Sequence, residues 1–141
     1  MVKTVLVAVD SSEFAWRVID ALGILHLEPH CLIVLAHIIP PPPPESIVAA
    51  DVPHIPDEEY EEFRDTEVWL GELSSDVAYT TTFEIVTGDA AEEIVRLAGI
   101  HKSDLIVLGS RGLKGMSRVI HGSVSSQVVA DAPCSVMVVR Q

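Results

Sequence analysis

The chain has 141 residues and carries 21 Asp and Glu against 9 Lys and Arg, a formal net charge of −12. Hydrophobic residues make up 48% and charged residues 21%, which excludes a wholly disordered, collagen-like or coiled-coil protein. The length predicts one domain over residues 1–141, and the acidic excess excludes a protein that coats nucleic acid, because such proteins need clustered Lys and Arg.

The charge is unevenly distributed along the chain. Residues 1–44 hold 4 acids and 2 bases, residues 45–93 hold 15 and 1, and residues 94–141 hold 2 and 6. The regional net charges are therefore −2, −14 and +4. The acidic middle is typical of a solvated helix face, whereas the basic last third is compatible with a small anion site.

A buried strand is predicted at the start of the chain, where residues 4–9 (TVLVAV) form a continuous apolar run. Asp10 and Glu13 then match a D-x-x-E capping box. The apolar residues that follow at helical spacing are Ala15, Val18, Ile19, Leu22 and Leu25. Because the first apolar run is too short for a signal peptide or a membrane span, we expect a cytoplasmic protein without membrane contact.

A second strand is predicted over Cys31–Ile39, and five consecutive prolines follow it at Pro40–Pro44. Prolines cannot donate to a sheet, so the chain must leave the sheet there. Residues 40–56 lack a clear helix or strand pattern, which predicts a long proline-rich loop. A surface spacer is the favoured interpretation, and a lid or partner-docking arm is the alternative.

The middle of the chain predicts an acidic helix over Asp57–Ser75 and a third strand over Thr80–Val86. The apolar residues near one stripe of that helix are Tyr60, Phe63, Leu70, Leu73 and Val77. This stripe is expected to pack on the sheet, with the carboxylates in solvent.

The last third of the chain repeats the alternation of strands and helices. Asp89 and Glu92 form a second D-x-x-E box before a helix, and a strand is predicted over Asp104–Leu108. The apolar residues of that helix are Ala91, Ile94, Val95 and Ala98, and those of a shorter final helix are Val124, Val128 and Val129. The last strand is predicted over Cys134–Val139, after Pro133.

This order predicts an α/β fold, an open five-stranded parallel sheet with helices on both faces. With strand order 3-2-1-4-5, the topological switch point lies between the first and fourth strands, and ligands bind beyond the carboxyl ends of such strands. Those ends are Asp10 and Gly109. Cys31 and Cys134 lie in apolar runs without CxxC spacing and are expected to be core residues.

A glycine-rich stretch, GSRGLKGMSRVIHGSVSS over residues 109–126, follows the fourth predicted strand and opens the last helix. This is the context that a phosphate-binding loop requires. Its glycines permit close backbone approach, the helix start presents free amides, and Arg111, Lys114 and Arg118 supply positive charge. The stretch therefore predicts an anion site, although it matches neither G-x-x-x-x-G-K-[ST] nor G-x-G-x-x-G.

Along essentially its whole length the chain resembles the universal stress protein family, in its nucleotide-binding subgroup. The subgroup pattern is Gly, two residues, Gly, nine residues, then Gly followed by Ser or Thr. Gly109, Gly112, Gly122 and Ser123 meet it at this spacing. The segments VLVAVDSSE, TGDAAEEIV and PCSVMVV are also similar to the family.

The resemblance implies a cofactor and the residues that hold it. ATP would lie at the switch point, with any Mg²⁺ bridged by its phosphates, Asp10 on the ribose, and Ala8 and Ile38 beside the adenine. The phosphates and ribose would be held by Gly109, Ser110, Arg111, Gly112, Gly122, Ser123, Val124 and Ser125. The resemblance also implies a homodimer formed through the last strand, Ser135–Val139.

Three functions remain open from the sequence. The first is an ATP-binding stress-response or signalling module that acts through dimer or partner contacts. The second is a weak ATPase or autophosphorylating protein, which is less well supported because the chain has no carboxylate between Asp104 and Asp131, and His121 is the one imidazole in the loop. The third is a structural dimer without nucleotide, against which the intact glycine pattern argues. No histidine or cysteine spacing indicates a metal site.

Overall fold

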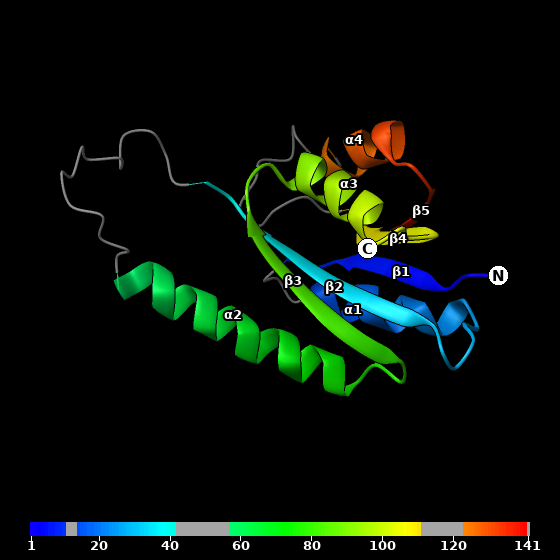
Figure 1. The fold of residues 1–141 in the computed structure, drawn as a ribbon, viewed down its shortest axis with the longest axis horizontal. Helices are drawn as coiled ribbons and strands as arrows, with labels where there is room; N and C mark the ends of the chain where they lie inside the picture. The colour runs from blue at the N-terminus through cyan, green and yellow to red at the C-terminus, as the bar shows by residue number, and fades with distance from the viewer. Residues whose placement is uncertain (11–13, 42–56, 111–122, 141) are drawn as a thin grey trace.

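The computed structural model describes residues 1–10, 14–41, 57–110 and 123–140, which form one sheet between two layers of helices (Figure 1). The strands are β1 (Thr4–Ala8), β2 (Leu32–Ile39), β3 (Thr80–Thr87), β4 (Leu105–Gly109) and β5 (Ser135–Val139). The helices are α1 (Phe14–Ala21), the short 3₁₀ helix η1 (Leu22–Ile24), α2 (Asp57–Ser75), α3 (Ala90–Ile100) and α4 (Ser123–Asp131). The strand ends differ from the predicted ends by no more than one residue.

The sheet has the predicted strand order, β3-β2-β1-β4-β5, and every strand pair in it is parallel. The central strand β1 joins the two halves, since Val5 pairs with Ile33 of β2 on one side and with Leu105 of β4 on the other. The predicted α/β class and the predicted switch point between β1 and β4 are therefore confirmed.

Alternating residues of the central strands supply two separate hydrophobic cores, because successive strand side chains point to opposite faces. Val5 and Val7 are fully buried in the core that α1 and α2 cover. Leu6 is fully buried in the core that α3 and α4 cover. This arrangement puts the α1 and α4 crossovers on opposite faces of the sheet (Figure 1), which determines where a ligand pocket opens.

The edge strands β3 and β5 are less buried than predicted, since the sequence indicated strands that are covered on both faces. In β3, Thr80, Thr82 and Phe83 are exposed, whereas the middle of β1 is entirely buried. A parallel edge strand has a neighbour on one side alone, and β3 also has little cover from α2 over part of its length.

Helix α2 follows the predicted stripe in its second half and departs from it in its first half. Leu70 and Leu73 are fully buried, but Phe63 is 39% exposed, and Val77 lies beyond the end of the helix, half-buried against the core. The prediction that the whole stripe packs on the sheet was therefore wrong for Phe63, because the first half of α2 diverges from β3 and leaves a hollow between them (Figure 1).

The start of α3 confirms half of the second predicted capping box. Asp89 is the N-cap, and its carboxylate accepts a hydrogen bond of 3.0 Å from the backbone N–H of Glu92. The first predicted box pairs Asp10 with Glu13, which lies outside the described residues, as does the proline-rich loop from residue 42 to residue 56.

The two cysteines differ in burial. Cys31 is fully buried, as predicted, but Cys134 is only half-buried against the second core. Burial, and secondarily the negative charge of Asp104, raises the pKa of both thiols. Cys134 is less enclosed than expected because it precedes the edge strand β5.

Among the described helices, none has the length and apolar character that a membrane span requires.

Candidate functional site

A pocket opens at the switch point, where β1 and β4 end side by side and their following helices lie on opposite faces of the sheet. Its empty volume is about 520 Å³, including solvent at its mouth. The strand residues that line it are Ala8, Val9, Asp10, Ile38, Leu108 and Gly109. The pocket lies where the sequence placed the switch point. It brings together four of the predicted site residues from the ends of three strands, namely Ala8, Asp10, Ile38 and Gly109.

Helices from both layers complete the walls. Helix α1 contributes Phe14, Ala15 and Val18, helix α3 contributes Ala90 and Ile94, and helix α4 contributes Val124. The pocket therefore reaches into both hydrophobic cores at their open end. Its walls are mainly apolar, and Asp10 is the one carboxylate among the described lining residues.

Gly109 is required here by the close approach of an aromatic ring. A Cβ atom placed on Gly109 would lie 2.7 Å from Cδ1 of Phe14 and closer still to Cε1. Any larger residue would thus displace the Phe14 ring from the pocket wall. The sequence predicted that Gly109 lets the backbone approach an anion, and it gave no sign that a side chain of α1 lies against this glycine.

Backbone and side-chain hydrogen bonds hold the strand ends that carry Ala8, Asp10 and Ile38. The N–H of Val9 donates to the carbonyl of Ala36 at 2.9 Å. His37 is buried, and its Nδ1 lies 2.9 Å from the carbonyl oxygen of Val9. Its ring also meets Trp69 edge-on, at 5.6 Å between centroids. His37 therefore fixes the rim of the pocket from behind, as expected of a satisfied strand residue.

The other rim is tied to β5 and faces the start of α4. The N–H of Ser110 donates to the carbonyl of Val139 at 2.8 Å, which extends the β4–β5 pairing beyond Gly109. Ser110 is half-buried and is not among the described lining residues.

Helix α4 begins at the pocket. Its second residue, Val124, lines the wall, while Ser123 is exposed and Ser125 is buried. Backbone N–H groups in the first turn of a helix have no acceptor within the helix, and together with the helix dipole they favour an anion at this end. An apolar pocket with hydrogen-bond donors at one rim suits a flat ring attached to an anionic group.

Three predicted site residues, Arg111, Gly112 and Gly122, lie outside the described residues. The sequence did not identify several wall residues, among them Phe14, Val18 and Ala90. Nothing in the sequence distinguishes these apolar helix positions from ordinary core positions. Among the described residues, no group of three or more His, Cys, Asp or Glu side chains is placed to hold a metal ion.

Comparisons with known proteins agree on one family. The model of the universal stress protein family matches residues 1–140. Universal stress protein MJ0531 of Methanocaldococcus jannaschii is 43% identical to this chain over 58 residues, which are 41% of this chain and 34% of that relative. The match thus spans about a third of that curated relative's length.

Two solved structures are similar over nearly the whole chain. Universal stress protein UspA from Lactobacillus plantarum is 28% identical with a TM-score of 0.66, covering 98% of this chain and 97% of that one. A universal stress protein in complex with cAMP is 26% identical with a TM-score of 0.68, covering 98% of this chain and 97% of that one.

Proposed function

Because the chain belongs to the universal stress protein family, we propose that it is an ATP-binding module of a stress response or signalling system. On this proposal it works by binding, and the bound nucleotide changes the contacts that the protein makes with a second copy or another partner. The observation that carries the proposal is the pocket between β1 and β4, bordered by Gly109 and by the start of α4. A relative solved in complex with cAMP supports an adenine nucleotide as the ligand class.

The adenine ring would lie between apolar walls near Ala8 and Ile38, which line the pocket together. A flat aromatic base gains from such walls through the burial of apolar surface. Asp10, at the carboxyl end of β1, would accept hydrogen bonds from the ribose hydroxyls.

The phosphates would lie toward the glycine-rich stretch. Gly109 allows close approach at the end of β4, and Ser123, Val124 and Ser125 at the start of α4 would hold the phosphates and ribose. The remaining proposed phosphate-binding residues are Ser110, Arg111, Gly112 and Gly122. Any Mg²⁺ would be bridged by the phosphates of the nucleotide.

Binding is favoured over turnover because phosphoryl transfer needs a group that positions the nucleophile. Asp10 is the one carboxylate among the described lining residues, and the proposal places it on the ribose. Slow ATP hydrolysis or autophosphorylation is the alternative. It would appear as steady ADP production, or as phosphate on the protein, that Gly122→Asp abolishes.

The first experiment is calorimetry and thermal unfolding with ATP, ADP, AMP and cAMP. Since a ligand that binds only the folded state stabilises it by mass action, ATP at a hundred times its Kd should add about 2.7 kcal/mol to the free energy of unfolding. Gly112→Asp, which breaks the glycine pattern, should lose the shift. The absence of a shift in the wild type at millimolar ATP with Mg²⁺ would contradict the proposal.

The role of Asp10 can be isolated with a ligand that lacks the hydroxyls. Asp10→Ala should weaken ATP binding at least about tenfold, because a hydrogen bond to a charged group contributes roughly 1.5–3 kcal/mol. For 2′,3′-dideoxy-ATP, which lacks these hydroxyls, Asp10→Ala and the wild type should have the same affinity. Equal losses for both ligands would show that Asp10 acts on the pocket rather than on the ribose.

The homodimer is proposed through β5, the edge strand Ser135–Val139, whose outer edge is unpaired within the described chain. A second β5 would satisfy its backbone groups, as exposed edge strands require. Light scattering with and without ATP would measure the assembly. A monomer at every concentration in both conditions would contradict this part of the proposal.

A further inference from the structure

A second hollow lies between α2 and β3, away from the nucleotide pocket. Its described lining residues are Phe63 and Glu67 of α2 and Phe83 and Ile85 of β3. Its empty volume is about 730 Å³, including open solvent. We call these four residues and the space between them the α2–β3 groove.

The groove is open because helix and strand diverge. Figure 1 shows α2 and β3 close together where Ser75 leads into Thr80, and well apart toward the N-terminal end of α2. Leu70 and Leu73, in the second half of the helix, are therefore completely buried.

Phe63 continues the same stripe seven residues before Leu70, but it is 39% exposed, and Phe83 opposite it is 42% exposed. Two phenylalanines on facing elements are thus partly exposed to solvent, with a hollow between them. Exposed apolar surface of this kind, bordered by charged residues, marks interaction sites.

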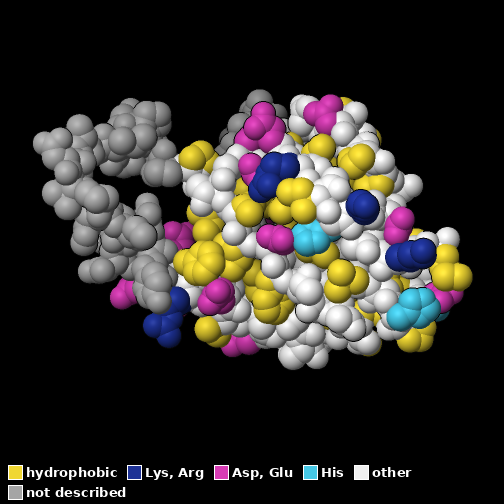
Figure 2. Space-filling model, viewed as in Figure 1, with side chains coloured by type: hydrophobic (Ala, Val, Ile, Leu, Met, Phe, Trp, Pro, Cys, Tyr) yellow, Lys and Arg dark blue, Asp and Glu magenta, His cyan; other side chains and the backbone are white. Residues whose placement is uncertain are grey.

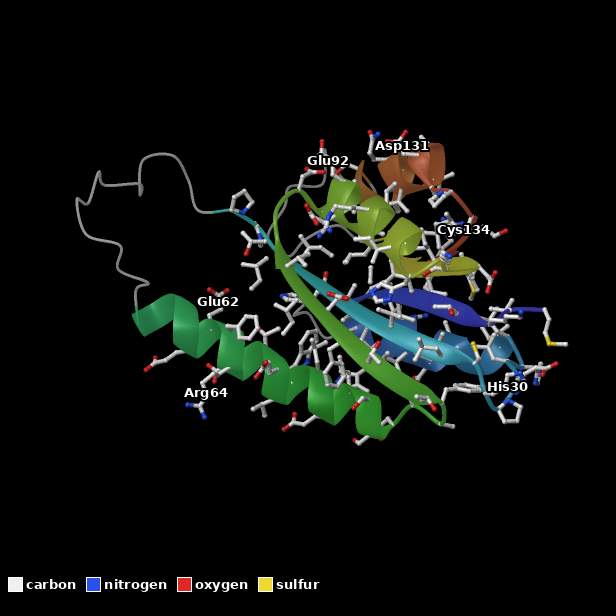
Figure 3. All side chains as sticks on the ribbon, viewed as in Figure 1. His30, Glu62, Arg64, Glu92, Asp131 and Cys134 are labelled. Atoms are coloured by element: carbon white, nitrogen blue, oxygen red, sulfur yellow. The ribbon has the colours of Figure 1, made fainter. Side chains whose placement is uncertain are left out.

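The charge around the groove is strongly negative. The sequence of α2 contains eight carboxylates and one cation, Arg64. The described carboxylates Glu61, Glu62, Asp65 and Glu67 are all exposed. Figure 3 shows Arg64 pointing away from β3, on the opposite side of the helix from Glu62. Figure 2 shows acidic and hydrophobic side chains mixed over this part of the surface.

We propose that the α2–β3 groove is a docking site for a basic segment of another protein, which inserts one aromatic or branched aliphatic side chain between Phe63 and Phe83. Lys and Arg residues beside that side chain would lie against the α2 carboxylates. Complementary charge speeds association and selects the partner, while burial of the apolar side chain between the two rings supplies most of the affinity.

Charge also argues against two other occupants. A second copy that docked through the same face would bring another α2 of the same sequence, and two strongly acidic helices repel each other. A membrane with anionic lipids would be repelled for the same reason. The proposal stands apart from nucleotide binding, since none of the four groove residues lines the pocket at the switch point.

The experiment titrates the full chain with a set of short synthetic peptides, each carrying one Phe, Trp, Ile or Leu flanked by Lys and Arg. Binding is followed by fluorescence anisotropy and by NMR chemical-shift changes. We expect saturable binding that weakens as salt is raised, with shifts centred on Phe83 and Ile85. Matched peptides with the apolar residue replaced by Ser should bind at least about tenfold more weakly.

The variants separate the groove from the charge of the surface. Phe63→Ser and Phe83→Ser should each weaken binding at least about tenfold, and both should fold, because these side chains are already partly exposed and lie outside the two buried cores. Val68→Ser is the matched control, since Val68 is a 63% exposed residue of the same helix that does not line the groove. It should bind like the wild type.

Three results would overturn the proposal. The first is that no peptide of the set binds. The second is that Phe63→Ser and Val68→Ser bind equally, which would reduce the effect to general attraction between charges. The third is that Phe83→Ser abolishes either self-association detected by light scattering or binding of the chain to anionic vesicles.

Discussion

The two ends of the β1–β4 strand pair show how one pair of strands can be closed at one end and open at the other. At the amino end, Oδ2 of Asp104 accepts hydrogen bonds from the backbone N–H of Lys3 at 2.8 Å and of Thr4 at 3.1 Å. The N–H of Asp104 donates to the carbonyl of Thr4 at 2.9 Å. At the carboxyl end, beyond Ala8, the same strands border the pocket.

The difference follows from where the chain goes next. At the amino end, the residues before the strands still pair, and the Asp104 side chain satisfies two backbone donors that would otherwise need water. At the carboxyl end, β1 leads to α1 on one face and β4 leads toward α4 on the other, so the described elements that follow the two strands separate there. A binding site and a closed end therefore arise from one topology, and substitutions at the two ends should have different effects.

The largest expected effect is at the open end. Gly109→Ala should weaken ATP binding about tenfold, because its Cβ would push the Phe14 ring into the pocket. Calorimetry measures the loss. In the Phe14→Ala background the same change should cost much less, and a loss of equal size there would contradict this cause. Gly71→Ala, where a Cβ meets nothing within 4 Å, should leave binding unchanged.

The next effect is at the closed end and concerns stability. Hydrogen bonds from the backbone N–H groups of Lys3 and Thr4 lower the pKa of Asp104. A lowered pKa in the folded state stabilises the protein above the ordinary aspartate pKa of about 3.9, and that stabilisation disappears as the pH falls through the folded value. Asp104→Ala should therefore be less stable than the wild type at pH 7.

This difference between Asp104→Ala and the wild type should shrink as the pH falls below about 4, because Asp104 is protonated first in the unfolded wild type and, at lower pH, in the folded protein as well. Urea unfolding at several pH values measures it. Asp104→Asn, which keeps one acceptor oxygen, should be intermediate. A difference that stays constant down to acid pH would show that charge has no part in closing this end. ATP affinity should not change in either variant.

The smallest effect concerns the two thiols near the closed end. Cys134 should react with a thiol reagent before Cys31, because Cys134 is half-buried and Cys31 is fully buried. Since Asp104 is the lesser cause of the raised thiol pKa values, Asp104→Asn should speed both reactions by less than about threefold. Mass spectrometry of the labelled protein identifies the sites. A faster reaction of Cys31 would contradict the burial order.

Much of the fold was predictable because its signals are local. Continuous apolar runs are typical of central parallel strands, and the D-x-x-E spacing at Asp89 predicted a helix start that the structure confirms. The order of strands and helices predicted a parallel sheet, and the switch point followed once the strand order 3-2-1-4-5 was assumed, an order that the structure confirms. Asp10 and Gly109 were thus predicted to lie together although 99 positions separate them in the chain.

By itself, then, the sequence determined the class of the fold, and with the assumed strand order 3-2-1-4-5 it predicted a ligand site at the ends of β1 and β4, where the pocket lies. Only the tertiary structure decided which apolar side chains line that pocket and that the Phe14 ring lies against Gly109. It also decided that Phe63 is partly exposed while Leu70 is buried. The reason is that periodicity specifies which face of an element is apolar. The extent of burial depends on the angle at which two elements meet, and packing across the whole sheet determines that angle.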